Sequence, residues 1–101
     1  MESVSWEDRD GARWIQLEGE LDHDACLDIG DRFREAVGAG EADVIVVMAG
    51  VTFLSSMGIG MLAKAREDLA RKGRVLKLQG LKPSLRGVLE SMNLMEVFEE
   101  L

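Results

Sequence analysis

The sequence lacks several features that mark whole classes of protein. It has one cysteine, Cys26, among 101 residues, which excludes an internal disulfide and any metal site built from several cysteines. Basic residues are few, with 12 Lys and Arg against 19 Asp and Glu, so the net charge of −7 leaves no broad basic surface for nucleic acid. The longest apolar run, residues 44–54, is shorter than the roughly 18–20 residues of a membrane span. No signal-peptide pattern, basic and then apolar, follows Met1. We therefore expect a soluble, cytoplasmic protein that binds no nucleic acid and inserts nothing into a membrane.

What the sequence does contain is enough to build one core. Hydrophobic residues make up 47% of the chain and charged residues 31%, a balance typical of a folded protein and not of a disordered acidic tail. The lone proline, Pro83, does not mark a domain boundary, and no linker or repeat is visible. We expect residues 1–101 to form a single domain.

The first part of the chain has the pattern of a β-hairpin. Val4 and Trp6 alternate with polar residues, and Asp10-Gly11 suits the positive φ angles of a tight turn. This pattern predicts a hairpin over residues 3–18, in which Trp6 and Trp14 are cross-strand partners.

Helical periodicity begins after the acidic segment 20–24, which supplies candidate N-caps. The buried face of this predicted helix, which ends at Gly38, comprises Cys26, Ile29, Phe33 and Val37. We accordingly interpret Cys26 as a packing residue. The other predicted elements are an interior strand over 44–48, a helix over 56–72, a strand over 75–78 and a helix that begins at Pro83. Residues 94–101 show no pattern that assigns their form.

The predicted order is therefore ββαβαβα. Each strand–helix–strand unit is expected to connect parallel strands by a right-handed crossover, and the opening hairpin adds an antiparallel pair. This is a small α/β domain with a mixed sheet.

The segment from Val51 to Gly60 is the most informative for function. It reads Val-Thr-Phe-Leu-Ser-Ser-Met-Gly-Ile-Gly and lies where an interior strand passes into a helix, a place where α/β sheets carry their sites. One serine, Ser55, is explained as a helix cap. Ser56 has no such task, and phosphorylation there would add about −1.5 to −2 charges at a helix N-terminus that can accept an anion.

Two motifs together resemble a known family, the STAS domains of bacterial anti-sigma factor antagonists. They are Gly19-Glu20-Leu21-Asp22 after the second predicted strand and the segment from Val51 to Gly60. In the family the second motif typically has an aromatic or apolar pair followed by Asp-Ser-Ser-Gly-Leu-Gly or Ser-Ser-Ala-Gly-Leu. Both motifs at this separation, within this order of elements, are fairly specific, and the resemblance covers almost the whole chain.

The resemblance implies a STAS fold and a partner-switching protein that is not an enzyme and needs no cofactor or metal. The antagonist binds an anti-sigma factor that is also a serine kinase, the kinase uses ATP to phosphorylate it, and a phosphatase restores it. Alignment on Gly58 makes Ser56 the phosphoacceptor, with Ser55 as the second candidate. The partner-facing positions implied are Asp22, Leu54, Ser55, Ser56, Met57, Gly58 and Ile59. The sequence departs from the family pattern at three polar positions, which here are Val47, Ser55 and Met57.

Three other functions fit parts of the sequence. Gly58-Ile59-Gly60-Met61-Leu62-Ala63 matches the dinucleotide fingerprint, but residues 49–57 intervene after the predicted strand, and we interpret the glycines as positions of close packing. A hydrolase would need Ser56, His23 and Asp22, yet the G-x-S-x-G nucleophile pattern is absent. STAS-like domains also serve as regulatory subunits of membrane transport systems, including lipid ABC transporters, and as modules of larger signalling assemblies; this is the main alternative.

Overall fold

The protein, described by a computed structural model over residues 2–101, is built on one five-stranded sheet in the order β1-β2-β3-β4-β5. β1 and β2 are antiparallel, and the three following pairs are parallel. The elements in chain order are β1 (Ser3–Arg9), β2 (Ala12–Leu21), α1 (His23–Gly38), β3 (Asp43–Leu54), α2 (Ser56–Ala70), β4 (Leu76–Gln79), α3 (Pro83–Ser91) and β5 (Glu99–Glu100). The predicted order ββαβαβα is confirmed, and the structure adds a short last strand from the tail that the sequence left unassigned.

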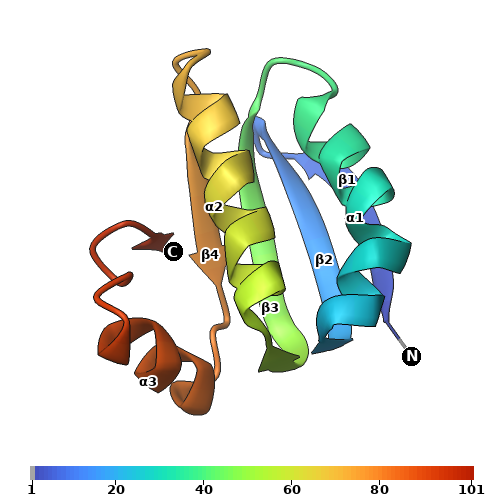
Figure 1. Ribbon diagram of the computed structural model, residues 1–101. Coiled ribbons are helices and arrows are strands. Elements are labelled where there is room, and N and C mark those ends of the chain that lie inside the picture. The colour runs from blue at the N-terminus through green and yellow to red at the C-terminus, as the bar shows by residue number, and fades with distance from the viewer. Residues whose placement is uncertain (1) are drawn as a thin grey trace.

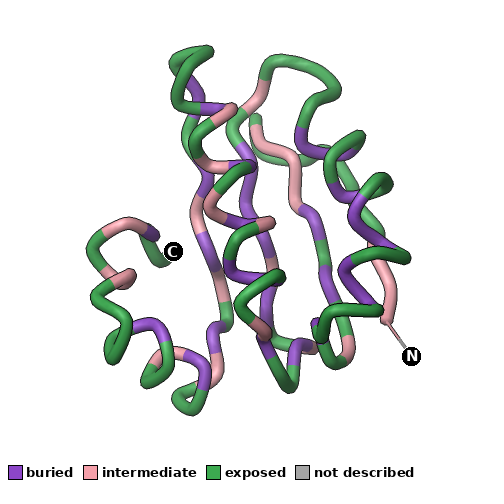
Figure 2. Tube along the Cα trace, viewed as in Figure 1, coloured by how far each residue is buried: buried purple, intermediate pink, exposed green. Residues whose placement is uncertain are grey.

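α1 and α2 lie side by side on one face of the sheet (Figure 1). The predicted apolar stripe of α1 is buried against the strands, as are the inward residues of α2 (Figure 2). α3 and the tail lie at the β4–β5 edge of the sheet, the edge opposite β1 (Figure 1). Among residues 2–101, no helix combines the length and hydrophobicity needed to cross a bilayer.

The opening hairpin turns as predicted, because Asp10 and Gly11 both have positive φ angles, 53° and 77°. The expected pairing of the two tryptophans is wrong. Trp6 lies opposite Ile15 and Trp14 lies opposite Glu7. Residues directly opposite in a hairpin share a face, so the two indoles are on opposite faces of the sheet.

β3 continues well past the predicted strand 44–48 and ends at Leu54. Two irregularities in its register with β2, after Gln16 and after Gly19, accommodate the extra residues. Gly19 has a φ of 99°, a conformation that glycine adopts without strain. The bulges thus keep β2 and β3 paired up to Leu21 and Leu54, which lie side by side at the ends of the two strands.

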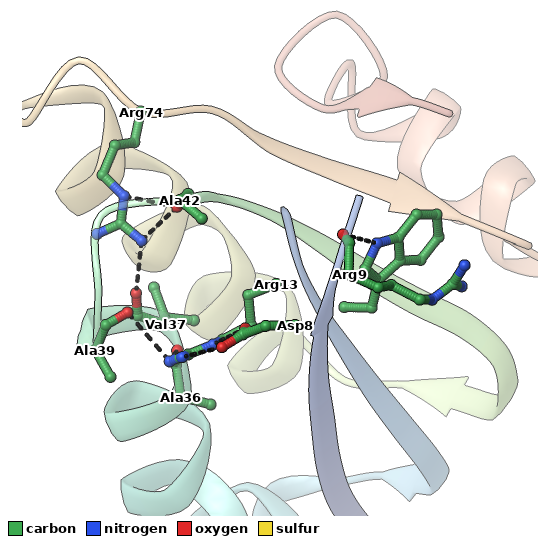
Figure 3. Close-up of polar contacts among 9 residues, drawn as sticks. Asp8, Arg9, Arg13, Ala36, Val37, Ala39, Ala42 and Arg74 are labelled. Atoms are coloured by element: carbon green, nitrogen blue, oxygen red, sulfur yellow. Dashed lines mark hydrogen bonds and ion pairs between the residues drawn. The ribbon is translucent and has the colours of Figure 1, made fainter. Parts of the chain in front are cut away.

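Two arginines fasten the opposite end of α1 (Figure 3). Arg13 forms a bidentate ion pair with Asp8 and donates to the carbonyl oxygens of Ala36 and Ala39 at 3.0 and 3.1 Å. Arg74, only 8% exposed, donates its Nε to the carbonyl oxygen of Ala42 at 2.8 Å. These bonds connect the hairpin and the start of β4 to the turn that leads into β3.

Candidate functional site

The candidate site lies where β2 and β3 end together. Leu21 pairs with Leu54 at the last position of the two strands, and Asp22 and Ser55 are the next residues along the chain. Both helices begin there, since Asp22 is the N-cap of α1 and Ser55 the N-cap of α2. The topology therefore brings the two sequence motifs to one edge of the sheet, as expected for the carboxyl ends of parallel strands.

The Ser55 hydroxyl is fully engaged in holding this edge together. Its Oγ donates to the carbonyl oxygen of Leu21 at 2.7 Å and accepts from the backbone N–H of Gly58 at 3.1 Å. The backbone N–H of Ser55 donates to the same Leu21 oxygen at 3.0 Å. Ser55 thus ties β2 to the start of α2, and its role as a cap is confirmed.

Ser56 has the opposite environment. It is the first residue of α2 and is exposed. At this helix end the backbone N–H groups of Ser55 and Gly58 already have acceptors. Within the described chain, the N–H groups of Ser56 and Met57 remain available to bind an anion. The site therefore combines an accessible hydroxyl with free donors and the positive end of the helix dipole, the environment in which a phosphate is tolerated.

Asp22 caps α1 and remains exposed. One carboxylate oxygen accepts from the backbone N–H of Ala25 at 2.9 Å. Such a cap is typically worth about 1 kcal/mol, so Asp22 has a structural task whatever else it does.

The residues around the two serines divide into an inner and an outer set. Leu54, Gly58 and Ile59 are buried, so their side chains support the turn from within. A Cβ on Gly58 would lie 2.8 Å from Leu54 Cδ1 and 3.2 Å from the Leu21 carbonyl oxygen, which explains the glycine by close packing. Met57 is exposed and is the apolar side chain nearest in sequence to Ser56.

Close packing explains only one of the two glycines in the segment that matches the dinucleotide fingerprint. Gly58 is a close-packing position, as predicted, but a Cβ on Gly60 would meet nothing within 4 Å. Because β3 runs to Leu54, the segment expected to separate strand from glycines is itself mostly strand.

Within residues 2–101, no group of three or more His, Cys, Asp or Glu side chains is arranged to hold a metal ion.

Cys26 is buried beneath this edge, as expected of a packing residue, with its Sγ 3.8 Å from the Leu21 carbonyl oxygen. Burial raises the pKa of the thiol; a contact with Ser55 lowers it and the charge of Asp22 raises it. The net direction is upward, which keeps the thiol neutral and unreactive near neutral pH.

Two exposed apolar residues near the site are absent from the predicted partner-facing set, Leu27 and Phe53, of which Phe53 is 49% exposed. Leu27, on the first turns of α1, is 63% exposed and lines a surface hollow together with Cys26 and Met57. It follows Cys26 directly and so lies off the predicted buried stripe, which is the signal that could have identified it.

The fold is that of a small α/β domain with a mixed sheet, and comparison with known proteins identifies its family. The STAS domain model matches residues 3–101, so the chain belongs to the STAS domain family. Curated proteins yield no match to the sequence.

Solved structures with the same fold include anti-sigma factor antagonists. One from Mycobacterium paratuberculosis has a TM-score of 0.83 at 23% identity, over 99% of this chain and 85% of the other. The Bacillus cell fate determinant SpoIIAA in its phosphorylated form has a TM-score of 0.71 at 24% identity, over 98% and 91%. The murine anion transporter Slc26a9 has a TM-score of 0.70 at 21% identity, over 89% of this chain but 15% of the transporter.

Proposed function

We propose that this protein is an anti-sigma factor antagonist that binds a serine-kinase anti-sigma factor and is released when Ser56 is phosphorylated. The observation that carries the proposal is the division of labour between the two serines. Ser55 is consumed by three hydrogen bonds at the strand ends, whereas Ser56 is exposed at the first position of α2. A modification of Ser56 thus changes the surface without breaking a bond that holds the fold.

The proposed switch is electrostatic. The kinase transfers the γ-phosphoryl group of ATP to Ser56 Oγ; an O–P bond forms there as the bond to ADP breaks, and the hydroxyl proton is released. The product carries about −1.5 to −2 charges beside the apolar Met57. In the free protein the helix N-terminus and water stabilise this charge, but in an interface the same charge must be desolvated, so the complex dissociates.

The partner surface consists of the exposed members of the predicted set, Asp22, Ser56 and Met57, with Ser55 at its edge. The buried members Leu54, Gly58 and Ile59 set the shape of this surface from below. The protein is itself the substrate, acts in the cytoplasm without a cofactor, and a phosphoserine phosphatase returns it to the binding state. The neighbour SpoIIAA, solved in a phosphorylated form, is the precedent that supports this proposal.

The test is to incubate the protein with ATP and the kinase anti-sigma factor encoded nearest to it, then map the modification by mass spectrometry. We expect phosphate on Ser56 and its loss in Ser56→Ala. Ser84→Ala is the matched control, because Ser84 is an exposed serine in the first turn of α3. Modification of neither serine, together with no binding of the kinase, would reject the proposal.

A second candidate is a regulatory subunit of a membrane transport system. The observation in its favour is the likeness to the Slc26a9 transporter over 89% of this chain. Affinity purification from the native host separates the two functions: a soluble kinase supports the first, and a membrane transport complex supports the second.

A further inference from the structure

An open groove runs between α1 and α2, beyond the serine edge. It consists of two hollows, of about 610 and 270 Å³, and both are lined by Arg34 of α1 and Met61 of α2, so they adjoin. The first hollow begins at Met57, next to Ser56, and the second ends at Arg71 and Lys72. At about 1.5 Å of rise per residue, the α2 wall from Met57 to Ala70 is roughly 20 Å long, and Arg71 and Lys72 follow directly.

The end of the groove near Ser56 is apolar. Leu27 of α1 and Met57 of α2 both line it and are 63% and 38% exposed. Met61, in the middle, is only partly buried against the core. Exposed apolar side chains gathered in a concave surface are characteristic of a binding site.

The far end of the groove is cationic, against the negative charge of the whole molecule. The two hollows together are lined by four cations, Arg34, Lys64, Arg71 and Lys72, and by two carboxylates, Asp31 and Asp68. Asp31 pairs with Arg34 in the hollow nearer Ser56, whereas Asp68 lies in the far hollow. Asp68 is shared between Lys64 at 3.3 Å and Arg71 at 2.7 Å. Within residues 2–101 Lys72 has no carboxylate partner, so the charge of its ammonium group is not neutralised by an ion pair.

We infer that this groove docks an amphipathic helix of the kinase anti-sigma factor, with apolar residues that contact Leu27, Met57 and Met61 and carboxylates that reach Lys64 and Lys72. The inference rests on the proposed function and names a second contact for the same partner. An amphipathic helix suits a groove of this length between two helices, and its acidic end complements the cationic end.

A second copy of this chain is a poorer occupant. Its acidic and apolar C-terminal tail would have the right chemistry, but that tail is built into its own fold. Phe98 is 2% exposed, and Glu100 is held by Arg86 through two hydrogen bonds.

The position of the groove has a kinetic consequence. Lys72, just past the end of α2, lies about four helical turns from Ser56, so contacts there are the same before and during phosphoryl transfer. Such uniform binding lowers KM without changing kcat. It also survives phosphorylation, so the modified protein keeps a weak affinity that depends on the groove.

The test compares two charge reversals that change the net charge equally. Lys72→Glu alters the cationic end, whereas Arg32→Glu alters an exposed arginine of α1 outside the groove. We expect Lys72→Glu to raise KM for Ser56 phosphorylation and the Kd of the complex about tenfold with kcat unchanged, and Arg32→Glu to stay within about twofold. Leu27→Glu should act like Lys72→Glu, with an unchanged circular dichroism spectrum because Leu27 is already exposed.

Each other outcome has a definite meaning. Equal effects of Lys72→Glu and Arg32→Glu, with normal phosphorylation of Ser56, would overturn the groove and leave the proposed function standing. Self-association of the wild type that Leu27→Glu abolishes would assign the groove to a second copy and also overturn it. A wild type that neither binds the kinase nor accepts phosphate would remove both the proposed function and the groove.

Discussion

At the scale of single residues, two adjacent serines have separate tasks. The hydroxyl of Ser55 is both donor and acceptor, to Leu21 and Gly58, while that of Ser56 faces water. The identical side chains therefore differ in what their removal costs, which makes the pair an internal control.

Ser55→Ala is expected to lower the free energy of unfolding by about 1–2 kcal/mol, because it removes a helix cap and leaves the Leu21 carbonyl oxygen with one fewer donor. Ser56→Ala should change it by less than about 0.5 kcal/mol, as for an exposed side chain. Urea denaturation of the two variants measures both values. Equal losses would show that the two hydroxyls are not divided in this way.

Two glycines of α2 form a second matched pair. Gly58→Ala would place a Cβ against Leu54 and 3.2 Å from the Leu21 carbonyl oxygen, so we expect a loss of about 1–3 kcal/mol in the free energy of unfolding. Gly60→Ala meets open space in a helix and should gain roughly 0.5–1 kcal/mol. Thermal or urea unfolding checks both signs, and stabilisation by Gly58→Ala would contradict the close packing.

At the scale of elements, the ends of α1 and of the sheet are held by buried or paired arginines. Arg74 follows the end of α2 in the basic segment Arg71-Lys72-Gly73-Arg74. In the structure its guanidinium turns inward and donates to the carbonyl oxygens of Ala42 and Val37. No periodicity in the sequence distinguishes it from Arg71, which stays on the surface.

Arg74→Ala is expected to cost about 1–3 kcal/mol of unfolding free energy, because the partly buried carbonyl oxygen of Ala42 and the buried one of Val37 lose their donor. Arg71→Ala, whose ion pairs are exposed, should stay within about 0.5 kcal/mol. Chemical denaturation of the two variants gives the comparison. A smaller loss for Arg74 than for Arg71 would argue against its fastening role.

The last strand is expected to be held less firmly in acid. Hydrogen bonds from Arg86 lower the pKa of Glu100 below its ordinary value of 4.5, so the pair stabilises the folded tail above that pH. Its contribution is lost as the pH falls through 4.5 toward the lowered pKa. We expect the amide resonance of Leu101, whose N–H donates to Leu78, to shift over this range.

Glu100→Gln should remove that acid transition, since the side chain can no longer titrate. Glu99→Gln is the control, because the Glu99 carboxylate is exposed and its ion pair with Lys77 is long, at 3.9 Å. A Leu101 resonance that is unchanged on acidification of the wild type would show that the ion pair does not hold the tail.

At the scale of the whole molecule, the sequence was sufficient for the order of elements and for the place of the two motifs. The Asp10-Gly11 turn and the spacing of apolar residues in α1 are local signals, and both are confirmed. The full length of β3 was not predictable, because Ala49-Gly50 is typical of a strand end and only the bulged pairing with β2 carries the strand onward. β5 depends on pairing with β4, which no local pattern encodes.

The candidate site was predictable to a similar depth. The residues that meet at the strand ends were identified from the motifs, and so was the cap role of Ser55. Which side chains face outward was not, because Leu54 and Ile59 are buried while Leu27, absent from both motifs, is exposed. Whether a side chain is buried or exposed depends on how α1 and α2 pack on the sheet, which is a property of the assembled molecule.

The most direct test of the account is the affinity of the kinase anti-sigma factor for two forms of this protein, unmodified and fully phosphorylated at Ser56. Isothermal titration of both forms, with circular dichroism to show that the fold is retained, measures the switch alone. The account predicts an affinity at least about tenfold weaker for the phosphorylated form, or ~1.4 kcal/mol of binding free energy. Equal affinities of the two folded forms would contradict it.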